Sequence, residues 1–259
     1  MNAAPRIASL VPSLTELLVE LGLGDRLIAR TGFCIHPAEA LRAVPKVGGT
    51  KDVNLAKLRR LAPTHVLVNV DENRRETVEA LAGWGADAPQ LIVTHPVGPD
   101  DNLGLIDQLV GIFGHLPGVA ARAAALRSAV QTELDATRAD GRVPQQVLYL
   151  IWRDPWMTVA RDTYLSAMLA RIGWRTLPAN EGGSHGAARY PVVRGDEIWL
   201  ADVQQVLLSS EPYSFGAKDV DAVRTLCPTA ALRLVDGEML SWYGARAVPG
   251  LRYLRALAG

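Results

Sequence analysis

Short apolar runs alternate with longer amphipathic segments along most of the chain, a pattern typical of strands that alternate with helices. In the first half, the apolar runs predict strands at 6–11, 27–29, 66–70 and 91–93. The amphipathic segments between and after them predict helices at 55–61, 76–84 and 102–113, besides one that follows the first strand. A βα unit repeated in this way favours a parallel sheet with helices on both faces.

The first helix has signals at both of its ends. Ser13 and Glu16 have the spacing of a capping box, in which the Glu16 carboxylate reaches back to the backbone N–H of the capping residue. The apolar positions Leu17, Leu18 and Leu21 continue the helix, and the glycines at 22 and 24 end it.

The segment 119–139 differs from its surroundings because it contains neither proline nor glycine and is rich in alanine and unbranched residues. Its composition predicts one long helix of about 30 Å that ends at Asp140 and Gly141. Alternation then resumes, with strands at 147–151, 203–208 and 232–235 and helices at 164–172, 219–226 and 248–258.

The fold class that this order predicts is α/β, with two Rossmann-like lobes of parallel sheet joined by a single long helix. The expected boundaries are 1–115 for the N-terminal lobe, 116–142 for the connecting helix and 143–259 for the C-terminal lobe. Each lobe is long enough to bury a core of its own.

Composition narrows the function classes. The 259 residues include 27 basic and 27 acidic side chains, so the net charge is zero and the basic excess of a nucleic-acid-binding protein is missing. Two cysteines make no disulfide framework, and no apolar run reaches the ~18–20 residues of a membrane span. As written, the sequence shows no leader, which predicts a cytoplasmic protein, or a periplasmic one if a leader has been removed.

Aromatic residues gather in the loops that follow the predicted strands of the second half, where open parallel sheets bind ligands. Seven of the chain's 15 aromatic residues lie there: Trp152, Trp156, Tyr190, Tyr213, Phe215, Trp242 and Tyr243. They form either a wall for a large, flat or apolar ligand or a cap on the core of the lobe.

Charged residues share these loops and their counterparts in the first half. They are Arg153, Asp154, Glu211, Glu238 and Arg246, together with Lys51, Asp52, Asp71, Glu72 and Arg74. This combination suits a ligand with an apolar body and a polar rim, whereas solvated or mutually paired charges are the alternative.

Other chemistry has weaker signals. Cys34 and His36 supply only two candidate ligands, whereas a structural zinc site needs four. Only their proximity supports Cys34 as a nucleophile with His36 as its base. His36 is instead a candidate axial contact to a metal already held in a ligand. Dinucleotide- and phosphate-binding glycine motifs are absent, and Asp71 and Glu72 have no partner carboxylate at a set distance.

Four segments together resemble a known family. RIASLVPSLTELLVELGLGDRLIA, KVGGTKDVNLAKLRRLAPTHVLV, IWRDPWMTVARDTYL and DGEMLSWYGAR, with the long helix between them, are similar to the helical-backbone metal-receptor proteins. These are solute-binding proteins of ABC importers for cobalamin, ferric siderophores and haem, with class III periplasmic-binding-protein architecture. The chain looks closest to the cobalamin-binding branch.

The resemblance implies a shallow ligand cleft between two lobes, no catalysis, no catalytic cofactor or bound metal of its own, and a monomer that docks on an ABC permease. Glu76 and Glu79 are the candidate docking acids of the first lobe. The residues expected to contact the ligand are Ser13, Lys51, Glu72, Arg74, Trp152, Arg153, Trp156, Tyr190, Glu211, Tyr213, Phe215, Trp242, Tyr243 and Arg246.

Two functional hypotheses follow. The first is a solute-binding protein that holds a corrinoid, a ferric siderophore or another metal chelate. The second is a cytoplasmic enzyme or handling protein that acts on such a chelate through Glu72, Arg153, Cys34 or His36.

Overall fold

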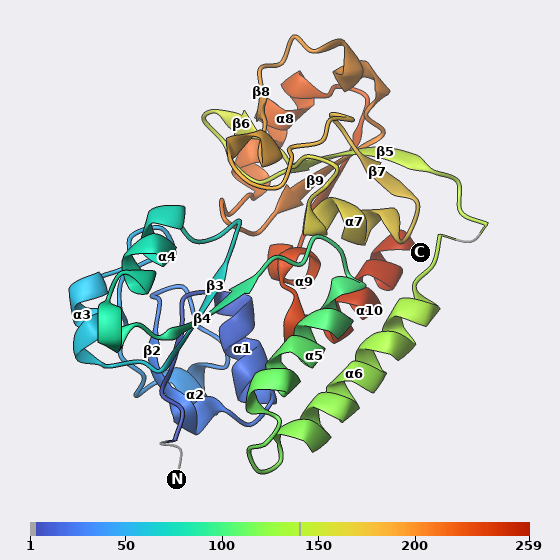
Figure 1. The fold of residues 1–259 in the computed structure, drawn as a ribbon. Coiled ribbons are helices and arrows are strands. Elements are labelled where there is room, and N and C mark those ends of the chain that lie inside the picture. Colours follow the sequence, from blue (N-terminus) through green and yellow to red (C-terminus); the bar gives the residue numbers. More distant parts are fainter. Residues whose placement is uncertain (1–3, 140) are drawn as a thin grey trace. The chain divides into compact units, whose positions relative to one another are not determined.

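The computed structural model describes residues 4–139 and 141–259, and the chain divides into two compact units, each with its own parallel sheet (Figure 1). Unit 1 comprises Met1–Pro96, Asn102–Ala129 and Tyr243–Arg246. Unit 2 comprises Val97–Asp101, Val130–Trp242 and Ala247–Gly259. The predicted α/β class with two parallel-sheet lobes is confirmed.

The sheet of unit 1 has the strand order β2-β1-β3-β4, with every pair parallel. Its strands are β1 (Ile7–Ser9), β2 (Leu27–Arg30), β3 (His65–Asn69) and β4 (Gln90–Thr94). All four predicted strands are present, although the first is shorter than its apolar run. One face carries a core cluster that includes Ala8, Val66 and Val68 from the central strands and Leu58 and Leu81 from helices.

The helices of unit 1 follow the strands. They are α1 (Pro12–Glu20), α2 (Ala38–Leu41), α3 (Leu55–Arg60), α4 (Arg75–Ala82) and α5 (Asp101–Phe113), whose first residue belongs to unit 2. The short 3₁₀ turns of both units are η1 (Gly24–Arg26), η2 (Gly85–Asp87), η3 (Ala187–Arg189), η4 (Ile198–Asp202), η5 (Ala217–Asp219) and η6 (Gly244–Arg246). The sequence pattern missed α2, which is a single turn.

The predicted capping box of the first helix is wrong. Helix α1 begins at Pro12, and Val11 occupies the capping position without a side-chain hydrogen bond. Proline suits the first helical position because its fixed φ and missing N–H cost nothing there. Ser13 is therefore already inside the helix, and Glu16 instead makes two hydrogen bonds of 2.8 Å with the Arg246 guanidinium.

The long helix is confirmed as α6 (Val119–Ala136), which begins in unit 1 and ends in unit 2. It ends three residues before the predicted 139, and the predicted stop at Asp140 lies outside the described residues. At its end, the Arg171 guanidinium donates hydrogen bonds to the carbonyls of Leu134 and Thr137. A side chain distant in sequence thus satisfies the last carbonyls of the helix, which a local pattern does not reveal.

The sheet of unit 2 has the order β10-β9-β5-β7, again entirely parallel. Its strands are β5 (Gln145–Leu150), β7 (Trp174–Thr176), β9 (Gln205–Ser209) and β10 (Ala231–Val235), and β6 (Trp156–Met157) and β8 (Val192–Val193) form a separate antiparallel pair. The sequence pattern missed β6, β7 and β8, which have two or three residues each.

Helices cover both faces of this sheet. They are α7 (Tyr164–Ala170), α8 (Val220–Leu226), α9 (Gly237–Ser241) and α10 (Ala247–Ala258). Alternate strand residues such as Leu148, Leu150 and Leu208 pack with Val223 of α8 in one core cluster. Helices α7, α9 and α10 contact one another, and Figure 1 shows them together, away from α8. Among the described residues, no helix has the length and apolar content to cross a bilayer.

Candidate functional site

In unit 1, three loops at the carboxyl ends of the strands are tied together by asparagine side chains. The Asn69 Oδ1 accepts hydrogen bonds from the backbone N–H groups of Asp71 and Glu72, at 2.8 and 3.3 Å. The Asn73 Nδ2 donates to the carbonyls of Leu10 and Thr50, at 3.2 and 3.0 Å. These bonds fix the backbone that carries the predicted site residues Lys51, Glu72 and Arg74.

The cations at this edge already have partners. The Lys51 Nζ donates to the Asp71 carbonyl at 2.7 Å, and burial lowers the pKa of Lys51 against the opposing effect of Glu72 and Asp71. Arg74 pairs with Asp52 across 3.3 Å at the exposed surface. At this edge Lys51 is therefore held by a backbone carbonyl and Arg74 by a carboxylate.

Tyr243 and Glu72 form a buried pair within unit 1. The Tyr243 hydroxyl donates to Glu72 Oε1 at 3.1 Å, and only 6% of Tyr243 is exposed. Burial and the nearby Glu72 hold the pKa of Tyr243 well above its ordinary value, while hydrogen bonds with Ser13 and Thr94 oppose the shift. Tyr243 thus stays protonated and acts as a donor, and the predicted residues Ser13, Glu72 and Tyr243 lie together.

Arg246, a predicted ligand contact, is paired within unit 1. Its guanidinium is 11% exposed and binds both carboxylate oxygens of Glu16. This pair holds η6 against α1. Gly244 of η6 has a φ of +78°, and a Cβ at this position would lie 3.1 Å from Leu17, so the close approach to α1 requires a glycine. Arg246 therefore has a structural partner within its own unit.

The loop after β2 contains residues that sequence reasoning missed. Phe33 and Ile35 are 64% and 49% exposed, although the Arg30 guanidinium holds the loop backbone by donating to the carbonyls of Thr31 and Cys34. These two residues were missed because the sequence analysis considered aromatic residues only in the loops of the second half, whereas Phe33 and Ile35 follow a strand of the first half. His36, in the same loop, is half-buried.

Cys34 differs from its neighbours because it is fully buried. Burial raises the pKa of its thiol, while hydrogen bonds with the Thr15 and Thr31 hydroxyls act in the opposite direction. A buried thiol with a raised pKa is inert. The structure gives no support to Cys34 as a nucleophile.

His95 was also missed. It follows β4, and its Nε2 lies 3.4 Å from Asp71 Oδ2 in a largely buried arrangement. The sequence signal for His95 was its position two residues after the strand predicted at 91–93.

In unit 2, four predicted aromatic residues form one group at the ends of β5 and β9. The Tyr213 ring lies 5.8 Å from Trp152 and 4.7 Å from Phe215, and Phe215 is stacked with Trp156 at 6.2 Å. Phe215, Trp156 and Tyr213 also pack on the core, whereas Trp152 is 41% exposed. The group therefore caps the core and presents an aromatic surface at its Trp152 end.

Arg153 completes this surface but is paired. Its guanidinium lies over the Trp156 ring at 5.5 Å and binds Asp219, which also accepts from the Tyr213 hydroxyl at 3.2 Å and from Gly216 N at 3.0 Å. Burial opposes ionisation of Asp219, but these hydrogen bonds hold its pKa below the ordinary value. Sequence reasoning assigned Asp219 only to a helix start and missed this role.

Glu211, just after β9, contacts Trp242, which directly follows α9. The Glu211 Oε1 accepts hydrogen bonds from Ser241 Oγ and Trp242 Nε1, both at 2.8 Å. Burial raises the pKa of Glu211, and these two bonds oppose the shift. Tyr190, by contrast, lies half-buried on a separate loop after η3, beside the buried Arg189.

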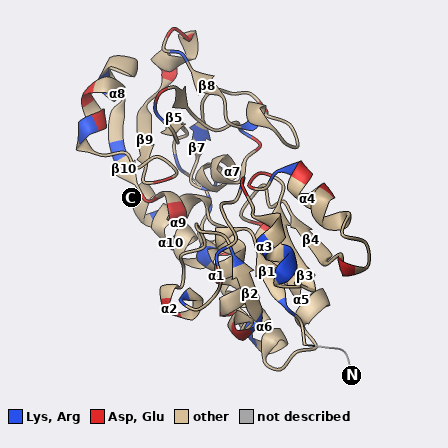
Figure 2. Ribbon diagram, turned by 90° about the vertical axis from the view of Figure 1, so that its left-hand side faces the viewer, with Lys and Arg blue, Asp and Glu red and all other residues tan. Residues whose placement is uncertain are grey.

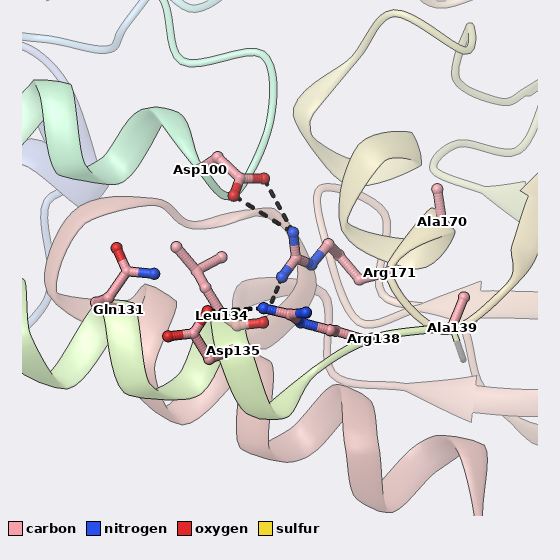
Figure 3. A pocket seen from close by; sticks show the side chains of 8 residues that line it. All are labelled: Asp100, Gln131, Leu134, Asp135, Arg138, Ala139, Ala170 and Arg171. Atoms are coloured by element: carbon pink, nitrogen blue, oxygen red, sulfur yellow. Dashed lines mark hydrogen bonds and ion pairs between the residues drawn. The ribbon is translucent and has the colours of Figure 1, made fainter. Parts of the chain in front are cut away.

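A pocket of about 350 Å³ lies elsewhere in unit 2 (Figure 3). It is lined by residues at the ends of α6 and α7 and by Asp100, and it contains none of the predicted site residues. Its arginines are paired, Arg171 with Asp100 at 3.1 Å and Arg138 with Asp135 at 3.0 Å. Within the described part of the chain, no group of three or more His, Cys, Asp or Glu side chains is arranged to hold a metal ion.

The candidate docking acids Glu76 and Glu79 lie exposed on α4. Glu79 accepts from the Arg75 guanidinium at 2.8 Å one turn away. In Figure 2, ribbon segments of basic and acidic residues adjoin at the start of this helix.

The family model described as periplasmic binding protein matches residues 7–233. The chain belongs to the periplasmic binding protein family. This membership confirms the resemblance derived from the sequence and a binding role in place of an enzymatic one.

A vitamin B12-binding protein of Photorhabdus laumondii is 25% identical over 213 residues, which cover 81% of this chain and 72% of the relative. The crystal structure of the periplasmic vitamin B12 binding protein of Vibrio cholerae has a TM-score of 0.80 at 18% identity, over 98% and 96% of the two chains. The periplasmic haem-binding protein of Vibrio cholerae has a TM-score of 0.76 at 22% identity, over 98% of each chain. At these identities, the likeness to the two solved structures establishes the fold.

Proposed function

We propose that this protein is the solute-binding component of an ABC importer and binds a corrinoid. The observation that carries the proposal is the continuous aromatic group of unit 2, which ends in the exposed ring of Trp152. An aromatic surface at the carboxyl ends of parallel strands is where such a fold binds a large planar ligand. The vitamin B12-binding relative supports the same ligand class.

The charges favour a corrinoid over haem. Haem carries two propionate groups, which need unpaired cations, whereas the periphery of a corrinoid ring carries neutral amides. Arg74 is paired with Asp52, and Arg153 is paired with the buried Asp219.

The remaining predicted contacts belong to this proposal, apart from Glu72 and Glu211, whose carboxylates bind Tyr243 and Trp242. Phe33 and Ile35 are added to the predicted set because their apolar surface is exposed beside the unit 1 strand ends. His36 would supply the axial contact to the metal. The proposal also includes a periplasmic location, a monomeric state and docking of Glu76 and Glu79 on the permease.

Tryptophan fluorescence titrated with cyanocobalamin, cobinamide, haem and a ferric siderophore tests the proposal. We expect saturable quenching with both corrinoids and weaker or no quenching with haem. The Trp152→Ala variant should bind about 10-fold more weakly, since it removes an exposed aromatic contact. Ile198→Ala is the matched control in unit 2, because Ile198 is 91% exposed and lies in another loop. No binding of either corrinoid by the wild type would refute the proposal.

A further inference from the structure

Trp242 and Tyr243 differ from the exposed Trp152 because both are buried and both have a polar tip bound to a carboxylate. They are 8% and 6% exposed. Trp242 donates from Nε1 to Glu211, and Tyr243 donates from its hydroxyl to Glu72. The two adjacent residues belong to different units, since Trp242 ends a segment of unit 2 and Tyr243 begins one of unit 1.

Glu211 is fixed on all sides. The backbone at Glu211 is bound to the Ser209 hydroxyl, which accepts from Glu211 N and donates to Glu211 O, and Tyr149 donates to the same hydroxyl at 2.8 Å. Ser241 shares the carboxylate oxygen that holds Trp242. Gly237 packs so closely that a Cβ there would lie 2.6 Å from Glu211 Cγ. These contacts hold the Glu211 carboxylate in a single position.

Glu72 is fixed in a comparable way. Its backbone N–H is bound to Asn69, in the turn that directly follows β3. The Tyr243 hydroxyl donates to its Oε1 at 3.1 Å. Tyr243 thus has its ring buried and its hydroxyl bound to a carboxylate whose backbone is fixed.

We propose that Glu211 and Glu72 are positioning residues for the ligand-binding surface, which set the orientations of Trp242 and Tyr243 and do not themselves contact the ligand. The inference rests on the proposed function only where it concerns affinity. Each acid binds the polar tip of one ring, Glu211 that of Trp242 and Glu72 that of Tyr243. The pair of acids thereby holds both rings of the dipeptide at set positions in their own units.

The first test compares two variants of Glu211. Glu211→Gln keeps an oxygen that accepts from Trp242 and Ser241, whereas Glu211→Leu removes the acceptor of the buried Trp242 Nε1–H, and Ser241 still donates to the Gly237 carbonyl. We expect Glu211→Leu to lose the near-ultraviolet circular dichroism of Trp242, identified as the signal that is missing in Trp242→Phe. Cyanocobalamin binding should weaken about 10-fold in Glu211→Leu and recover in Glu211→Gln. Glu181→Leu is the matched control, since Glu181 is an exposed acid of the same unit.

A double-mutant cycle separates positioning from direct contact. In the Trp242→Phe background, Glu211→Leu should weaken binding by less than about 2-fold beyond Trp242→Phe alone. The same relation should hold for Glu72→Leu in a Tyr243→Phe background. Additive losses, or a Glu211→Gln variant that loses affinity while its dichroism is intact, would show that the acids contact the ligand and would overturn the inference.

Failure of the proposed function gives a different result. If the wild type binds neither corrinoid, the dichroism of Glu211→Leu and Glu211→Gln still decides whether Glu211 orients Trp242. Unchanged dichroism in Glu211→Leu would overturn the positioning role whatever the ligand is. Should Glu211→Leu fail to fold, Glu211→Met also removes the carboxylate that accepts from Trp242 but keeps an unbranched side chain, and it is read by the same dichroism band. Loss of that band supports the inference, and an unchanged band overturns it.

Discussion

At the scale of single residues, the buried Asp219 and the half-buried Glu211 of unit 2 respond to their surroundings with pKa shifts in opposite directions. Asp219 accepts hydrogen bonds from a guanidinium, a hydroxyl and a backbone N–H, so its pKa is lowered in spite of its burial. Glu211 accepts from two neutral donors, and the acids Glu238 and Asp236 add to the effect of burial, so its pKa is raised. A cation within reach decides the direction of the shift.

Asp219→Asn should therefore lower the stability of the protein in a pH-dependent manner. The folded-state pKa of Asp219 lies below its unfolded value, so its stabilising contribution is complete above about pH 4 and is lost as the pH falls through the folded pKa. Thermal midpoints measured across pH should show a gap between wild type and Asp219→Asn that closes toward acidic pH. Asp221→Asn, an exposed acid on α8, should show no such trend. A gap of equal size at every pH would contradict this account.

His36 carries a second prediction at this scale, which concerns the metal of the ligand. A neutral imidazole that coordinates cobalt replaces a water ligand, so aquocobalamin bound to the wild type should show a changed visible spectrum. His36→Ala should bind with the spectrum of the free ligand. His185→Ala is the control, because His185 is exposed in a loop of unit 2, whereas His36 belongs to unit 1. Identical spectra for wild type and His36→Ala would exclude the axial contact.

At the scale of elements, the periodic pattern predicted those strands and helices that carry enough residues to show a period. The strands β3 and β5 and the helices α5 and α6 were found, whereas β7 and α2, with three and four residues, were not. The start of α1 was predicted wrongly because Ser13 and Glu16 have the spacing of a capping box. The helix instead begins at Pro12, a residue that suits the first helical position. The three-residue β1 was found because it lies within the longer apolar run 6–11, so a local pattern is most informative where it is long.

The site was predicted less completely because its contacts join residues distant in sequence. The loops were found, since the ends of strands can be read from the pattern. The pairing of Arg246 with Glu16, 230 residues apart, and that of Arg153 with Asp219 could not be derived from spacing. These partners decide which charges face a ligand and which hold the fold.

Gly237 provides a test of element packing where β10 passes into α9. A Cβ at this position would meet Ser209 Oγ, and would lie 3.1 Å from Glu211 N. Gly237→Ala should therefore destabilise the protein by about 1–3 kcal/mol, measured as a lower urea midpoint. Gly104 of α5 has open space around it, so Gly104→Ala should stabilise by about 0.5–1 kcal/mol. A Gly237→Ala protein as stable as wild type would show that the junction can adjust.

At the scale of the whole molecule, 27 basic and 27 acidic side chains balance, and the structure shows how the balance is built. Ion pairs hold charges at the strand ends and between elements, as in Arg153–Asp219 and in the pairs that Glu133 makes with Arg252 and Arg255. A chain of zero net charge exerts no net long-range attraction on an anionic ligand. Recognition must then depend on apolar contact and on hydrogen bonds at short range.

This balance predicts that binding is insensitive to salt. Cyanocobalamin has no net charge, so its contribution to stability should be the same at low and high ionic strength, while attraction of an anion would be screened as the Debye length falls from about 10 Å at 0.1 M to about 3 Å at 1 M. At a ligand concentration of 100 times Kd, binding stabilises the folded chain by about 2.7 kcal/mol. The rise in thermal midpoint with cyanocobalamin should therefore persist when salt is added, and should be smaller for Trp152→Ala at the same ligand concentration. A rise that disappears with salt would show that unpaired charges, and an anionic ligand, govern recognition.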